Sequence, residues 1–107
     1  MNNINATKKT IQKLLGYLNF VPKENEKSIY YKVYTGKYTI EIDSENEIIN
    51  YGDKIKSDNK TTQNFSRSEN FVVLECVDRL LEKGYQPQKI ILEKTYPAAF
   101  SDLIRLR

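Results

Sequence analysis

Three acidic positions in the C-terminal half of the chain could take part in chemistry: Glu69, Glu75 and the Glu93-Lys94 pair. A carboxylate on a helix that precedes a core strand can point at a nuclease metal site, because Mg²⁺ takes oxygen ligands from several carboxylates. Each position also has a structural explanation. Glu69 completes an S-x-x-E capping box with Ser66, and Glu75 lies four residues before Arg79. Adjacent residues of a strand point to opposite faces, so Glu93-Lys94 does not form a nuclease Glu-x-Lys pattern. We favour the structural roles.

The composition excludes several other kinds of site. The 107 residues contain no histidine, so neither a Ser-His-Asp nor a Cys-His mechanism can be built from this chain. Cys76 is the only cysteine, which rules out an internal disulfide. We expect Cys76 to act as a small hydrophobe on the apolar face of its helix. The four glycines form no phosphate-binding loop, and we expect no cofactor.

The net charge of +3 is compatible with nucleic acid and equally with a mildly basic, solvated surface. The candidates for contact with DNA phosphates are four cations on a polar segment and the helix start that follows it: Lys54, Lys56, Lys60 and Arg67. Tyrosines near lysines can stack bases or serve a protein interface, although tyrosine also covers sheet faces well. The tyrosines concerned are Tyr30, Tyr34, Tyr38 and Tyr51.

The elements that must position these residues can be predicted from periodicity. Residues 7–19 carry an apolar stripe at helical spacing, with Thr7 as the N-cap. Residues 28–51 change to a period of two, typical of half-buried strands, with short turns at Thr35-Gly36 and Ser44–Glu47. This pattern predicts a three-stranded antiparallel meander. In its first strand, Ile29, Tyr31 and Val33 alternate with Tyr30, Lys32 and Tyr34.

The second half is predicted to hold a long mobile loop at residues 52–63, a capped helix, and a short buried strand, Ile90–Leu92. On the helix, one face is predicted to be apolar and the opposite face to be charged. The apolar face holds Val73, Cys76, Val77, Leu80 and Leu81, and the charged face holds Glu75, Asp78, Arg79, Glu82 and Lys83. Gly84 is expected to end the helix in a left-handed cap. The divergent tail, residues 98–107, could add a helical turn or two.

The order α-β-β-β-α-β predicts a single α+β domain, in which two helices cover a small, mostly antiparallel sheet. No apolar run approaches the roughly 20 residues that span a bilayer, and no signal peptide is evident. We therefore expect a cytoplasmic protein.

Residues 38–97 resemble an N-terminal, nuclease-like region of bacterial type I restriction-modification proteins of the modification (methylase) subunit type. The likeness is carried by three segments: YTIEID, INYGDKIK and TTQNFSRSENFVVLECVDRLLEKGYQPQKIILEKTYP. It implies the opening of a PD-(D/E)xK nuclease fold, in which an aspartate strand and a Glu-x-Lys strand would follow. Only Glu75, or alternatively Glu69, can be carried over as a metal ligand. After Pro97 the sequence departs from the family pattern, either as a fragment of a larger protein or as a free-standing relative.

Three functions fit these observations. The first is a non-catalytic accessory module that contacts duplex DNA or a restriction-modification subunit. The alternative is a small phage- or mobile-element-type inhibitor of a bacterial defence enzyme, such as a restriction or CRISPR effector. The least favoured is a nuclease completed by a second chain, in which Glu75 would be a metal ligand.

Overall fold

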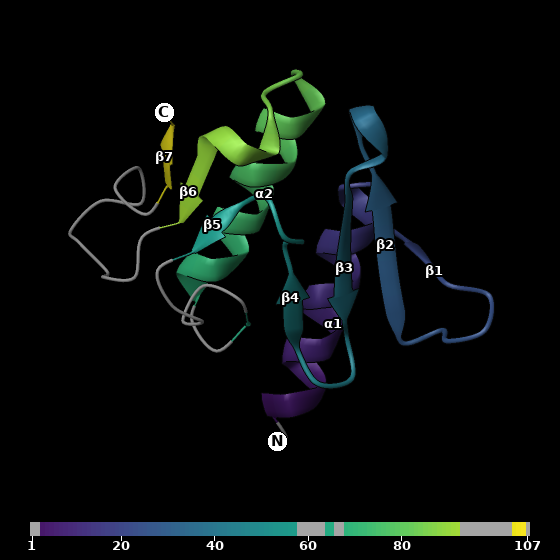
Figure 1. Ribbon diagram of the computed structural model, residues 1–107. Helices are drawn as coiled ribbons and strands as arrows, with labels where there is room; N and C mark the ends of the chain where they lie inside the picture. The colour runs from purple at the N-terminus through teal and green to yellow at the C-terminus, as the bar shows by residue number, and fades with distance from the viewer. Residues whose placement is uncertain (1–2, 58–63, 66–67, 93–103, 107) are drawn as a thin grey trace.

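A computed structural model describes residues 3–57, 64–65, 68–92 and 104–106 of the chain. It has two helices and two small sheets (Figure 1). The helices are α1 (Asn3–Tyr17) and α2 (Ser68–Glu82). The strands are β1 (Val21–Pro22), β2 (Ile29–Val33), β3 (Thr39–Asp43), β4 (Ile48–Asn50), β5 (Lys56–Ser57), β6 (Ile90–Leu92) and β7 (Ile104–Leu106). The predicted α+β class is confirmed.

The larger sheet is antiparallel and has the strand order β1-β2-β3-β4. It contains the predicted meander, extended at one edge by β1. Pro22, which has no backbone N–H to donate, lies on this edge strand opposite Tyr30, where a proline is tolerated. A short 3-10 turn at Thr35–Lys37 joins β2 to β3, and Gly36 adopts a positive φ of 76° there.

The smaller sheet has the order β5-β6-β7. β5 pairs with β6 in parallel, and the chain between them contains α2, so β5, α2 and β6 form a β-α-β crossover. β6 pairs with β7 antiparallel. The predicted strand Ile90–Leu92 has the bounds expected, but it belongs to this second sheet rather than to the meander.

Three local predictions are corrected. Thr7 lies inside α1, which begins four residues earlier, and is therefore not its N-cap. Within the predicted loop 52–63, Lys56–Ser57 is a strand, because β6 supplies its backbone partner. In the tail, Ile104–Leu106 is a strand instead of a helical turn, because it pairs along the other edge of β6. Residues 58–63 and 98–103 and the capping serine Ser66 lie outside the described residues.

Both helices end in the same type of left-handed cap. Asn19 has φ 69°, and the Phe20 N–H donates to the Leu15 carbonyl at 2.8 Å. Gly84 has φ 95°, and the Tyr85 N–H donates to the Leu80 carbonyl at 3.0 Å. These are Schellman-type bonds, and they confirm the predicted role of Gly84.

One hydrophobic core lies between the helices and the sheets. The inner face of the larger sheet packs its isoleucines against both helices, and β6 completes the core. Its fully buried side chains include Ile11, Leu15, Ile40, Ile42, Ile49, Val73, Leu74, Val77, Ile90 and Leu92. None of the described helices is long and apolar enough to cross a membrane.

The polar and apolar faces of α2 differ from the prediction by one position. Leu74 and Asp78 are buried with Val73, Val77 and Leu81, whereas Cys76 is exposed. The expectation that Cys76 is a core hydrophobe is therefore wrong, and so is the placement of Asp78 on the solvated face. A helix repeats every 3.6 residues, so positions 70, 73, 74, 77, 78 and 81 share one side.

Candidate functional site

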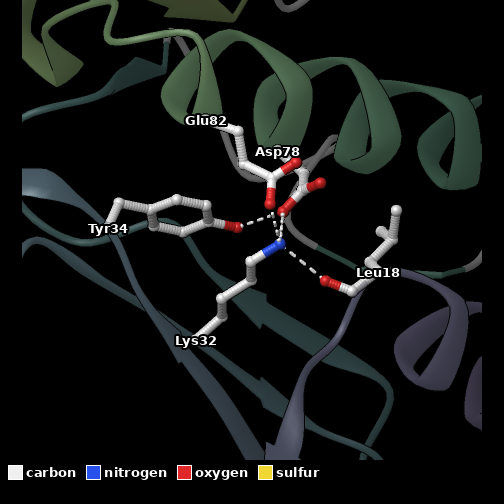
Figure 2. Close-up of polar contacts among 5 residues, drawn as sticks. All are labelled: Leu18, Lys32, Tyr34, Asp78 and Glu82. Carbon is white, nitrogen blue, oxygen red and sulfur yellow. Dashed lines mark hydrogen bonds and ion pairs between the residues drawn. The ribbon is translucent and has the colours of Figure 1, made fainter.

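A cluster of charged side chains joins β2, α2 and the end of α1 (Figure 2). The Lys32 ammonium lies at its centre and donates three hydrogen bonds. Its acceptors are the Leu18 carbonyl at 2.6 Å, Asp78 Oδ1 at 2.7 Å and Glu82 Oε2 at 2.8 Å. The Tyr34 hydroxyl donates to the same Asp78 oxygen at 2.6 Å. The Lys32 ammonium and the Tyr34 hydroxyl thus both donate to the buried Asp78 carboxylate of α2.

Burial makes this cluster more than a surface ion pair. The side chain of Lys32 is 11% exposed and that of Asp78 is 2% exposed, while Glu82 is half exposed. Lys32 also lies 5.3 Å from the centre of the Tyr34 ring and 6.0 Å from that of Phe20, at distances where a cation is attracted to an aromatic face. The cation is thus compensated by two carboxylates, a carbonyl and two rings.

Lys32 and Tyr34 both hold their protons more firmly than usual. Partial burial by itself would lower the pKa of Lys32, but the hydrogen bonds to Asp78 and Glu82 outweigh it and raise the pKa above its usual value. Burial, and then the hydrogen bond to Asp78, raise the pKa of Tyr34 far above its usual value. Both groups therefore keep their protons across the physiological range.

The two proton donors of the cluster are not available as bases or nucleophiles. An ammonium has three protons, and all three of Lys32 are used, so its nitrogen has no lone pair for nucleophilic or base chemistry. Tyr34 is held as a hydroxyl donor. The cluster therefore acts as a cross-link between the sheet and α2.

A small pocket of about 240 Å³ opens beside the cluster. Its volume is below the roughly 300–1,000 Å³ of typical small-molecule sites. Arg79 on its wall is bonded to Glu75 at 2.8 Å, so this guanidinium is already engaged. The pocket is lined by Tyr17, Leu18, Asn19, Lys32, Asp78, Arg79 and Glu82.

Of the carboxylates considered as metal ligands, the structure describes only the side chain of Glu75. Glu75 forms the expected i,i+4 pair with Arg79 on the surface of α2. The side chain of Glu69 and the pair Glu93-Lys94 lie outside the described residues. Among the side chains that the structure describes, no group of three or more acidic, histidine or cysteine residues could hold a metal ion.

Two of the four cations proposed to contact DNA are described. Lys54 and Lys56 are both exposed, and neither forms an ion pair with a carboxylate in the described part of the chain. Lys56 lies opposite Ile91 on β6, and Ile91 lies opposite Arg105 on β7, so the register places two basic positions in one cross-strand row. Lys60 and Arg67 lie outside the described residues.

The tyrosines considered for an interface lie largely inside the protein. Tyr34, Tyr38 and Tyr51 are buried, and the half-buried Tyr30 packs against the core. Tyr38 donates to the Tyr51 carbonyl and accepts bonds from the backbone N–H groups of Lys54 and Ile55. The buried rings of Tyr34, Tyr38 and Tyr51 are not free to stack on a partner, whereas Tyr30 is only half-buried. The burial of the three rings favours the alternative considered from the sequence, in which tyrosine covers a sheet face.

Comparison with protein-family models, curated proteins and solved structures finds no match for this chain. The resemblance to restriction-modification proteins therefore stays a prediction from the sequence segments.

Sequence reasoning missed the central pair, Lys32 and Asp78. A signal was present on each element. Lys32 lies between Tyr30 and Tyr34 on one side of a strand, and Asp78 lies four residues after Leu74 and three before Leu81. Taken alone, each residue is of a type expected on the surface. Both are buried because their side chains form an ion pair.

Proposed function

We propose that this chain is a non-catalytic binding module that contacts duplex DNA through Lys54 and Lys56. The observation that carries the proposal is the presentation of these two exposed ammonium groups on a fixed backbone. The Tyr38 hydroxyl accepts the N–H groups of Lys54 and Ile55, at 3.3 and 3.2 Å, and the pairing of β5 with β6 holds Lys56. A backbone that is already fixed before binding loses less conformational freedom when its lysines contact DNA.

Two further points support a binding role. The resemblance to type I restriction-modification proteins links the chain to DNA-processing enzymes, yet it carries over only one carboxylate, Glu75, which is bonded to Arg79. In addition, the Lys32 ammonium has no free lone pair to offer a reaction, because it donates all three of its protons within the fold. We accordingly assign no catalytic step to the described residues.

The proposal is tested by fluorescence anisotropy with a labelled 20-base-pair duplex over a range of NaCl concentrations. Each neutralised phosphate contributes a slope of about −0.9 in a plot of log K against log salt concentration. We expect the Lys54→Gln/Lys56→Gln variant to bind more weakly and its slope to flatten by about 2.

The matched control is Lys9→Gln/Lys13→Gln, which removes two exposed lysines from α1 and lowers the net charge by the same amount. This control should keep the wild-type slope. Equal losses in the two variants would mean that only net charge matters. That result, or the absence of binding at low salt, would refute the proposed DNA contact.

A further inference from the structure

Strand β2 turns its more apolar side away from the core. Tyr30, Lys32 and Tyr34 lie on the inner side with the cluster and the core, so Ile29, Tyr31 and Val33 lie on the outer side. Burying the opposite side would have enclosed two aliphatic residues and a tyrosine without a charge. The fold instead buries a lysine, which it compensates with two carboxylates. The outer side of β2 is thus apolar, although this orientation buries a charged lysine on the inner side, and burying a charge costs free energy.

The outer side of β2 belongs to a larger uncovered face. The register places Val21 beside Tyr31, and Ile48 two strands away beside Asp43. Val21, Val33 and Ile48 are 48%, 53% and 48% exposed, and they are three of the five large hydrophobic residues exposed in the described part of the chain. In Figure 1, α1 lies behind this sheet, and no described helix covers the near face.

Carboxylates flank the apolar stripe along the neighbouring strand, β3. Glu41 lies opposite Tyr31, and Asp43 lies opposite Ile29. Bonds from the backbone and side-chain N–H groups of Asn46 lower the pKa of Asp43, so this carboxylate stays ionised. Glu41 is bonded to Lys23 at 2.8 Å, and each side chain of this pair is more than a third exposed, so a competing cation can reach it.

The dimensions of the face select the kind of element that could cover it. The four strands together hold 15 residues, of which β2 and β3 supply five each. With about 3.3 Å per residue along a strand and about 4.8 Å between strands, the sheet has a flat area of roughly 240 Å². A stable dimer of two such faces would need about 800 Å² from each partner. A single helix about 10–12 Å across suits this area, just as the inner face of the same sheet packs against the 15-residue α1.

We propose that the outer face of the β1-β2-β3-β4 sheet docks an amphipathic helix of a partner protein, with its apolar stripe on Tyr31 and Val33 and its lysine or arginine residues beside Glu41 and Asp43. The partner is thus a basic helix rather than an acidic one or a second copy of this chain. The surface shares no residue with the proposed DNA contact, so the two proposals can fail separately.

The test uses ¹⁵N-labelled full-length protein and two synthetic 18-residue helical peptides. Both peptides carry the same leucine stripe, flanked by lysines in one and by glutamates in the other. We expect the lysine peptide to shift the amide resonances of Val21, Tyr31, Val33 and Ile48. Binding should weaken at least fivefold in Val33→Ser and in Glu41→Gln, and should be unchanged in Tyr17→Ser, which alters an exposed aromatic residue on α1.

Val33 and Glu41 lie outside the core, so a dispersed spectrum of each free variant will show that it remains folded. Equal binding of the glutamate peptide would refute the charge complementarity. Shifts centred elsewhere, or no binding, would refute the docking surface. Concentration-dependent shifts of the same four amides in the protein alone would assign the face to self-association and overturn the proposed partner.

Discussion

Lys32 on β2 and Asp78 on α2 lie 46 positions apart in the sequence, and their Nζ and Oδ1 atoms are 2.7 Å apart. This bond joins the sheet to the helix at a point where both side chains are almost fully enclosed. A buried charge is tolerated only with its partner, so each residue makes the other necessary.

Removing one partner should therefore be severe. We expect Asp78→Ala to lower the free energy of unfolding by about 3–5 kcal/mol, because it leaves the Lys32 ammonium buried with a weaker set of acceptors. The triple variant Lys32→Met/Tyr34→Phe/Asp78→Leu should lose much less, because it also removes the Tyr34 hydroxyl that donates to Asp78 and so leaves none of these three side chains with a buried polar group to compensate. Urea denaturation measures both. Glu75→Ala, which breaks the more exposed pair with Arg79, is the control and should cost less than about 1 kcal/mol.

The stability of the protein should fall at alkaline pH, in part because of Tyr34. Above pH 10 a tyrosine of the unfolded chain loses its proton, while the raised pKa of Tyr34 keeps it protonated in the fold. The folded state then binds more protons than the unfolded state, so stability falls as the pH rises. Urea midpoints at pH 9 to 11 should decline less steeply in Tyr34→Phe than in the wild type. The control is Tyr17→Phe, which removes the hydroxyl of an exposed tyrosine. If the urea midpoints of Tyr34→Phe declined with pH as steeply as those of the wild type and of this control, the role of Tyr34 would be contradicted.

Gly52 should not tolerate a side chain. Its φ is +82°, and an added Cβ would lie 2.5 Å from the Tyr38 hydroxyl oxygen. We expect Gly52→Ala to destabilise the protein by about 2 kcal/mol or more, through backbone strain and overpacking. Gly16→Ala is the opposite case, since Gly16 lies within α1 and a Cβ there meets nothing within 4 Å. The free energy of unfolding of Gly16→Ala should rise by about 0.5–1 kcal/mol. Thermal unfolding should therefore show a lower midpoint for Gly52→Ala and a higher midpoint for Gly16→Ala than for the wild type.

Cys76 should react with thiol reagents in the native protein, because its residue is exposed. Partial burial of the thiol, and then the charge of Glu75, raise its pKa, so the reaction at pH 8 should be slow. Glu75→Gln should accelerate it, as measured with Ellman's reagent in the absence of denaturant. A thiol that reacts only in urea would show that Cys76 is enclosed after all.

The predictable part of the fold is the part with local patterns. Alternation identified β2, β3 and β4, and glycine chemistry placed the end of α2 at Gly84. Alternation could not say which side of β2 faces inward, because that choice depends on Asp78 and Glu82, which come from a distant helix.

The missed elements depend on distant partners in the same way. β5 and β7 contain two and three residues, too few for any period, and exist because β6 lies between them. The displaced face of α2 has a similar cause. An aspartate on the inner side of a helix contradicts the polar-out rule, so the rule favoured Cys76 for the core and Asp78 for solvent. For the candidate site, sequence reasoning did not identify the buried Lys32. Lys54 and Lys56 are exposed, and their contact with DNA stays a prediction.

The β5-α2-β6 crossover also bears on the order in which the protein folds. Pairing of Lys56 with Ile91 closes a long loop of chain that contains all of α2. The strands of the meander, in contrast, pair with sequence neighbours across short turns. Loop closure over a long segment is slow, so the smaller sheet should be the last to form. Pulse-labelled hydrogen exchange during refolding should therefore protect the amides of β2 and β3 before those of β5 and β6. The surface that presents Lys56 would then exist only once folding is complete.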